Sequence, residues 1–213
     1  MNKLRLSLIA FPGAPQEVIQ RGENIIKEKL SEISVEIVNE QPDAFFIISG
    51  GSEMQAKELL QSTQRILILS MTENNSYAAA TEIKSYCNKN NINSILYNID
   101  YESDIAKNIN FYLKSNQALS KISKYSVGLI GNVSEWLINS DIERPVLQNK
   151  LGLKIQNISW NDFPKYSEYN SDNEFMNHFK DENFDLNDSS KVYNLLQDII
   201  NKKQLDAITV ECF

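Results

Sequence analysis

The sequence is short of the residues from which disulfide frameworks, zinc clusters and histidine-based active sites are built. It contains two cysteines, Cys87 and Cys212, and one histidine, His178, among 213 residues. Two thiols exclude a disulfide framework of the kind found in small secreted domains and are too few for a cysteine zinc cluster. A single imidazole leaves little room for histidine catalysis or a multi-histidine metal site. We expect His178 to be solvated and Cys212 to be a small core residue.

Basic clusters and long apolar runs are also missing. The net charge is −7 and the sequence pI about 4.9, which argues against a nucleic-acid partner because such proteins present a basic face. No apolar run approaches the roughly 18 residues of a membrane span. The first residues pair basic side chains with a short apolar run, but Arg5 interrupts it and no small-residue cleavage site follows. We therefore predict a buried strand here, and a cytoplasmic protein with no membrane partner.

Short apolar runs alternate with amphipathic segments over the first part of the chain. Strands are expected at 4–11, 34–39, 43–51, 65–70 and 92–99, and helices at 15–31, from Ser52 to about Gln61, at 77–90 and at 103–123. This alternation predicts an α/β fold with a doubly wound, mostly parallel sheet of flavodoxin-like or Rossmann-like type. The link between 34–39 and 43–51 is too short for an ordinary crossover helix. The strand at 34–39 is therefore expected to be antiparallel or at a sheet edge, unless a short helix lies in the link.

A second, smaller α/β unit is expected after residue 123. Its strands are predicted at 125–131, 153–159 and 205–213, its helices at 146–152 and at 192–203 with Ser189 or Ser190 as a cap, and a long polar loop with one helical turn at 160–190. We thus predict two domains, 1–123 and 124–213. A buried parallel strand normally feeds a further helix, so the second domain is expected to be incomplete. Alternatively, its third strand closes a small complete domain.

Two candidate ligand loops follow predicted strands of the first domain. Gly50, Gly51 and Ser52 free the backbone before a helix, whose unpaired N–H groups can hold an anion, although such a turn often serves only to reverse the chain. Asn75 lies in a polar loop suited to a hydroxyl-rich ligand. There Ser76, like Ser52, is predicted to cap the next helix.

A third candidate loop, in the second domain, carries Ser134 and Trp136 after the apolar run that ends on Gly131. The indole of Trp136 could stack on a sugar face while its neighbours supply hydrogen bonds, or it could belong to a core or an interface. Glu211 is interpreted as an ordinary strand residue and not as a metal ligand. The residues alone yield candidate ligand loops but no catalytic constellation.

Four segments, taken in order, resemble the sugar-isomerase group that includes L-fucose isomerase. They are ISGGSE (48–53), NNSYAAATEI (74–83), VGLIGNVSEWLINS (127–140) and LDAITVECF (205–213). The resemblance covers this chain and about the first half of a family member. In the relatives the tryptophan loop usually has a proline where this sequence has Val133, a difference that bears on the rigidity of the loop.

The resemblance implies an aldose–ketose isomerase that uses a divalent metal, typically manganese, and transfers a proton through an enediol. It also implies a homo-oligomer in which the N-terminal domain of one subunit helps to cover a neighbour's site. The family's metal-binding Glu, Asp and His follow the strand that ends in Cys212-Phe213, so no catalytic or metal-binding residue carries over to this chain. A substrate-side role carries over to Ser134 and Trp136, and on weaker grounds to Gly50, Gly51, Ser52 and Asn75.

Three functions are therefore open. The leading expectation is the N-terminal region of an L-fucose-isomerase-like enzyme that acts on a small sugar and is catalytically silent in isolation. The second is a non-catalytic sugar-binding or sensor module, because two α/β units also describe small-molecule binding proteins. The third is a structural domain that supports oligomer assembly.

Overall fold

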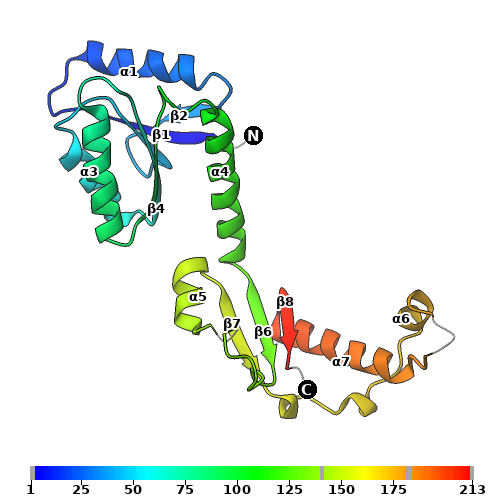
Figure 1. Cartoon of the computed structure of the whole chain (residues 1–213). Coiled ribbons are helices and arrows are strands. Elements are labelled where there is room, and N and C mark those ends of the chain that lie inside the picture. The colour runs from blue at the N-terminus through cyan, green and yellow to red at the C-terminus, as the bar shows by residue number, and fades with distance from the viewer. Residues whose placement is uncertain (1–2, 140–141, 181–183, 212–213) are drawn as a thin grey trace. The chain divides into compact units, whose positions relative to one another are not determined.

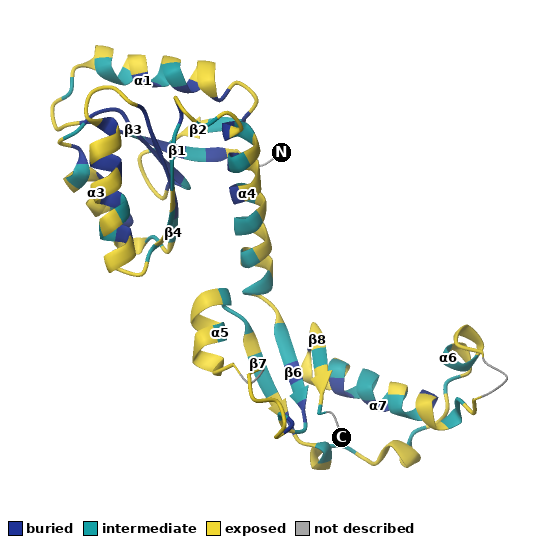
Figure 2. Cartoon of the chain, in the orientation of Figure 1, coloured by how far each residue is buried: buried dark blue, intermediate teal, exposed yellow. Residues whose placement is uncertain are grey.

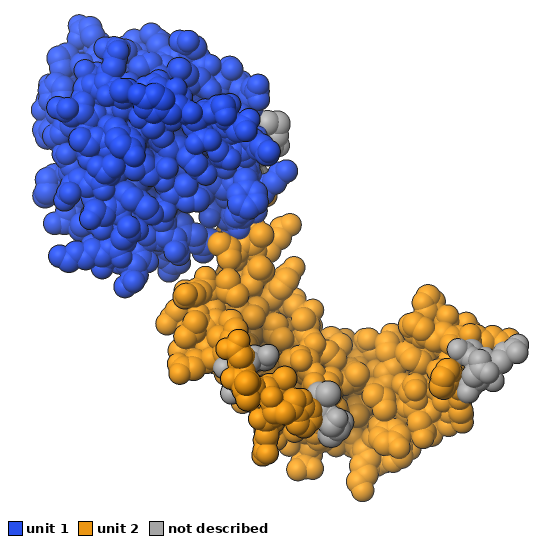
Figure 3. Space-filling model, in the orientation of Figure 1, with its two compact units in different colours: residues 1–116 blue, residues 117–213 orange. Residues whose placement is uncertain are grey.

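The chain folds into two compact α/β units, residues 1–116 and 117–213 (Figure 3). A computed structural model describes residues 3–139, 142–180 and 184–211. The larger unit, unit 1, contains a five-stranded parallel sheet, and the smaller unit 2 contains a three-stranded parallel sheet (Figure 1). The predicted fold class is confirmed. The division between the units falls within helix α4 (Ile105–Ile122), ahead of the predicted boundary after residue 123.

Unit 1 follows the predicted strand–helix alternation. Its elements are β1 (Leu4–Ile9), α1 (Gln16–Lys29), β2 (Val35–Ile37), β3 (Ala44–Ile47), α2 (Glu53–Leu59) with a 3-10 turn (Leu60–Ser62), β4 (Arg65–Ser70), α3 (Ser76–Lys89), β5 (Asn93–Asn98) and the first part of α4. The strand order is β2-β1-β3-β4-β5, the flavodoxin-like arrangement of a doubly wound sheet.

Different helices cover the two faces of this sheet. Helices α1 and α4 pack on one face, against a cluster that includes Leu6 and Phe46. Helices α2 and α3 pack on the other face, against a cluster that includes Phe45 and Ile68. All four residues of β3 are buried, as expected for a central parallel strand covered on both sides.

Strand β2 is an edge strand that pairs parallel to β1, so the antiparallel alternative is wrong. Residues 38–43 make the link to β3 through bends, with no helix. The register explains why so short a link suffices: Ile37, the end of β2, lies opposite Leu6, and so does Ala44, the start of β3. A doubly wound sheet of this order normally has a helix in this connection. Here the connection is the short link itself, and the Arg5 guanidinium donates to the carbonyl of Glu40 in that link at 3.0 Å.

Unit 2 is built around strand β6. Its elements are the end of α4, β6 (Ser126–Ile130), α5 (Arg144–Leu151), β7 (Lys154–Ile158), 3-10 turns at Trp160–Asp162 and Tyr166–Glu168, α6 (Asn173–His178), α7 (Asn187–Lys203) and β8 (Ala207–Val210). The strand order is β7-β6-β8, with all pairs parallel. Helix α7 packs Leu195 and Ile199 on one face of this sheet, against Ile130 and Ile158. Among the described residues, no helix combines the length and apolar character that crossing a membrane requires.

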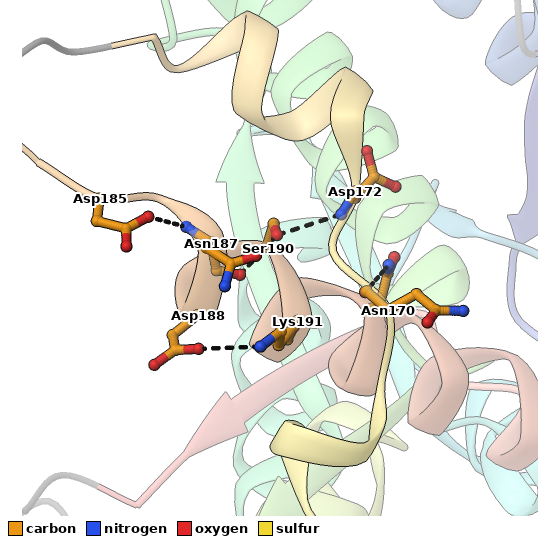
Figure 4. Close-up of polar contacts among 8 residues, drawn as sticks. Asn170, Asp172, Asp185, Asn187, Asp188, Ser190 and Lys191 are labelled. Atoms are coloured by element: carbon orange, nitrogen blue, oxygen red, sulfur yellow. Dashed lines mark hydrogen bonds and ion pairs between the residues drawn. The ribbon is translucent and has the colours of Figure 1, made fainter.

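Helix α7 begins at Asn187, five residues ahead of the predicted start, and neither Ser189 nor Ser190 caps it. Ser190 lies buried inside the first turn, where its hydroxyl donates to the Asn187 carbonyl at 2.7 Å and accepts from the backbone N–H of Asp172 at 3.2 Å (Figure 4). The serine thus ties the segment before α6 to α7. His178 ends α6, with its ring edge-on to Phe179, and Cys212 lies outside the described residues.

Candidate ligand-binding site

The C-terminal end of β6 is the point in unit 2 where the connections separate. The connection through α5 leads from β6 to β7, which neighbours β6 at one edge. The connection through α7 leads from β7 to β8, which neighbours β6 at the opposite edge. Helix α7 packs on one face of the sheet, whereas Leu147 of α5 faces Val127 and Ile155 on the opposite face. In open α/β sheets, ligands bind at such a switch point, beyond the carboxyl ends of the strands.

A cavity of about 420 Å³ lies at this switch point. Its walls come from the ends of all three strands and from α5, and they carry amide, hydroxyl, carboxylate, guanidinium and indole groups. The polar or aromatic lining residues are Asn132, Arg144, Asn157, Ser159, Trp160, Asn161 and Glu211. We call this cavity the polar compartment.

Glu211 holds the loop after β6 in place. Its carboxylate accepts a hydrogen bond from the backbone N–H of Asn132 at 2.9 Å, and its own N–H donates to the Ile130 carbonyl at 2.9 Å. Gly131, with φ of 85°, leaves no room for a side chain, because a Cβ there would overlap the Glu211 carboxylate. An ionised carboxylate has about four lone-pair sites on its two oxygens, so the bond from Asn132 leaves capacity for a ligand hydroxyl.

The Trp160 indole forms part of the wall of the same compartment and packs against the core of unit 2. Its Nε1 is buried and has no hydrogen-bond partner among the described residues, and it lies 3.0 Å from where a Cβ on Gly131 would sit. Buried polar groups are usually paired, so an unpaired N–H on a residue that lines the compartment is unusual.

An apolar cavity of about 330 Å³ adjoins the polar compartment and shares five of its lining residues. The remaining walls are mainly aliphatic: Val127, Leu137, Ile142, Leu147, Ile155 and Val210. We call this cavity the apolar compartment. Helix α5 has no fully buried residue, and much of its surface is exposed (Figure 2).

The predicted site residues of unit 2 lie differently with respect to these compartments. Ser134 is 6% exposed and lines the apolar compartment. Trp136 is 60% exposed and belongs to the lining of neither compartment. Stacking of a sugar on Trp136 would therefore take place outside both cavities.

The predicted site residues of unit 1 come together beyond the ends of β3 and β4. The backbone N–H of Gly50 donates to the Asn74 carbonyl at 2.8 Å, and a Cβ on Gly50 would lie 3.0 Å from that of Asn75. Ser52 is fully buried, and its hydroxyl donates to the Ser49 carbonyl at 2.7 Å. Ser52 occupies the N-cap position of α2, but no side-chain capping bond forms, contrary to the prediction.

Ser76 does not cap α3 either, because Asn75 takes the cap position in a left-handed conformation. The buried Ser76 hydroxyl instead accepts from the Met71 N–H and donates to the Ile47 carbonyl. Beside this loop, the Asp100 carboxylate accepts from the Thr72 N–H at 2.8 Å, and this bond lowers the pKa of Asp100. The polar groups of this edge thus bond mainly to neighbouring loops.

Sequence reasoning missed most of the polar compartment. The sequence pattern places Trp160 directly after the strand predicted at 153–159, at the start of the long polar loop with one helical turn at 160–190, but nothing in the pattern marks Trp160, Arg144 or Asn157 as a site residue. One signal in the sequence could have located the site. Ser159 and Asn161 come at the end of a predicted parallel strand, and polar residues come after β6 in the same way. Glu211, interpreted as a strand residue, lies just past β8 and lines both compartments.

The described residues contain no group of three or more His, Cys, Asp or Glu side chains placed to hold a metal ion. A scan against protein-family models finds no match, and a search of curated proteins finds none either. The resemblance to sugar isomerases consequently rests on the four sequence segments alone.

Proposed function

We propose that unit 2 binds a small sugar, and that the chain supplies a substrate-binding part of an L-fucose-isomerase-like aldose–ketose isomerase. The polar compartment at the end of β6 is the observation that carries this proposal. Its amide, hydroxyl and carboxylate groups are those that pair with sugar hydroxyls, and the Trp160 indole offers an apolar wall for C–H groups.

The isomerase part of the proposal rests on the sequence resemblance. In that scheme manganese would polarise the sugar oxygens during proton transfer, and its ligands would lie outside the described residues. The role of this chain would be to bind and orient the sugar. A cytoplasmic location and a homo-oligomeric state belong to the same proposal.

Titration calorimetry of the whole chain with L-fucose and L-arabinose tests the binding. We expect saturable binding in the wild type and about a two- to twelvefold loss of affinity in Asn157→Ala, because that change removes one hydrogen-bonding group of about 0.5–1.5 kcal/mol. Asn201→Ala, on the exposed surface of α7, is the matched control and should bind like wild type. No binding of either sugar, or equal losses in both variants, would refute the proposal.

Manganese separates the isomerase proposal from the sensor alternative. A sensor should bind one sugar tightly without metal, whereas an isomerase fragment should bind weakly and form no ketose. Ketose formation by this chain with manganese would contradict the predicted catalytic silence. Fluorescence provides a second readout, because Trp136→Phe leaves Trp160 as the remaining tryptophan of the two in the sequence.

A further inference from the structure

We propose that the two adjoining compartments of unit 2 together take one amphiphilic ligand, with a neutral polyhydroxylated head in the polar compartment and an apolar tail of several carbons in the apolar compartment. This inference rests on the proposed sugar binding and adds a second chemical group to the ligand. An alkyl or aryl glycoside has this chemistry.

The first argument is continuity. Leu129, Asn132, Val133, Arg144 and Glu211 line both compartments. A ligand whose head contacts Glu211 and Asn132 therefore needs no long linker to place its next atoms against the aliphatic walls.

The second argument is the character of the walls. Val127 and Ile155 project from the sheet, Leu147 from α5, and Leu137 and Ile142 from the loop between β6 and α5. Leu137 is 39% exposed and Ile142 50% exposed. Covering such side chains with another apolar group is favourable in proportion to the area removed from water.

The third argument is size. The apolar compartment measures about 330 Å³. At about 30 Å³ for each water-sized group, it has room for about eleven such groups, so a chain of eight carbons fits. A simple sugar would leave most of this volume unfilled.

Charge indicates a neutral head. Arg144 and Glu211 each line the polar and the apolar compartment. A ligand carboxylate or phosphate would be attracted by the first and repelled by the second, whereas hydroxyl groups can accept from one and donate to the other.

A chain-length series tests the proposal. We would measure by calorimetry the binding of D-glucose and L-fucose and of their methyl, butyl, hexyl and octyl β-glycosides, all below micelle-forming concentrations. Burial of one methylene contributes about 0.8 kcal/mol, so the Kd should fall about fourfold per carbon through the series up to the octyl glycoside.

Two neighbouring substitutions on α5 provide the matched pair. Leu147→Gln places a polar group in the apolar compartment and should at least halve the gain in affinity per carbon. Val146→Gln changes the adjacent side chain, which is 39% exposed and lines neither compartment, and should keep the wild-type gain.

The outcomes are separable. If no sugar or glycoside binds, the proposed function fails together with this inference. If free sugars bind but the affinity does not rise with chain length, only this inference fails. Equal effects of the two glutamine variants would show that tails adsorb to exposed surface, which also overturns it. Light scattering provides a further test. The inference is also overturned if the protein is a dimer and Leu147→Gln disrupts association but leaves glycoside binding unchanged, because a second copy would then occupy the apolar compartment.

Discussion

The two units carry the same local strand arrangement but use it differently. In unit 1, β1 lies between β2 and β3, and in unit 2, β6 lies between β7 and β8. The end of β1 is filled by the chain itself: the Phe11 N–H donates to the Ser49 hydroxyl at 3.1 Å, and the Phe11 Cβ lies 3.5 Å from where a Cβ on Gly51 would sit. The end of β6 opens into the polar compartment.

The difference shows that a strand's position does not by itself decide whether a ligand site forms. Ser49, Ser52 and Ser76 in unit 1 are buried, and their hydroxyls bond to backbone groups of the loops. In unit 2 the polar side chains at the corresponding strand ends face a cavity, and Trp160 Nε1 is unpaired among the described residues. Polar residues after a strand therefore indicate a ligand site only where they also line a cavity with hydrogen-bonding capacity to spare.

Alanine in place of Gly51 of unit 1 and of Gly131 of unit 2 should reveal the difference between the units most clearly. Gly51 and Gly131 have φ angles of 78° and 85°. We expect Gly51→Ala to lower the free energy of unfolding by about 1–2 kcal/mol through backbone strain. Gly131→Ala should cost about 3 kcal/mol or more and abolish sugar binding, because it also displaces the Glu211 carboxylate from Asn132. Urea unfolding measures both, and equal losses would contradict the difference between the units.

Serine substitutions at the two edges should have the next largest effect. Ser76→Ala leaves a buried donor and a buried acceptor unpaired, so we expect a loss of about 2 kcal/mol. Ser159 is exposed and its hydroxyl accepts from the Asn161 N–H at 3.2 Å, so Ser159→Ala should cost about 0.5 kcal/mol. Thermal unfolding provides the comparison, and a larger loss for Ser159→Ala would reverse our assignment of structural and ligand-facing serines.

Tyr112 allows unit 1 to be followed apart from unit 2. Its hydroxyl donates to the Asp43 carbonyl at 3.0 Å, and burial raises its pKa from 10.0 to about 12. Because the folded-state pKa is the higher one, this stabilisation is complete below pH 10 and is lost as the pH rises from 10 to about 12. Tyr112→Phe should cost about 1 kcal/mol at neutral pH.

The same substitution should flatten the alkaline dependence of unfolding. Ultraviolet titration of the tyrosines checks the pKa directly, with Tyr101→Phe, at a residue that is 78% exposed, as the control. A normal titration of Tyr112 would show that the hydroxyl is not buried in solution.

The sequence predicts the strands and a mostly parallel arrangement, but not the parallel pairing of β2, because buried apolar runs such as 65–70 have one plausible structure in an α/β chain. It did not predict where hydroxyl groups bond. A serine before a helix can cap that helix, but Ser76 bonds instead to Ile47 and Met71, outside the helix, and only tertiary packing decides between these partners. For the same reason Glu211 and Trp160, which lie far apart in the sequence, were not recognised as neighbours of Gly131.

The link between β2 and β3 makes unit 1 open to engineering. Residues 38–43 cross β1 where a doubly wound sheet of this order usually carries a helix, and polar contacts of Arg5 hold the crossing. A foreign helix or labelling tag grafted into this link would enter over a polar stretch of strand and would leave the packed side chains of both core clusters in place. Unit 1 therefore offers an attachment point for a reporter far in sequence from the polar and apolar compartments of unit 2.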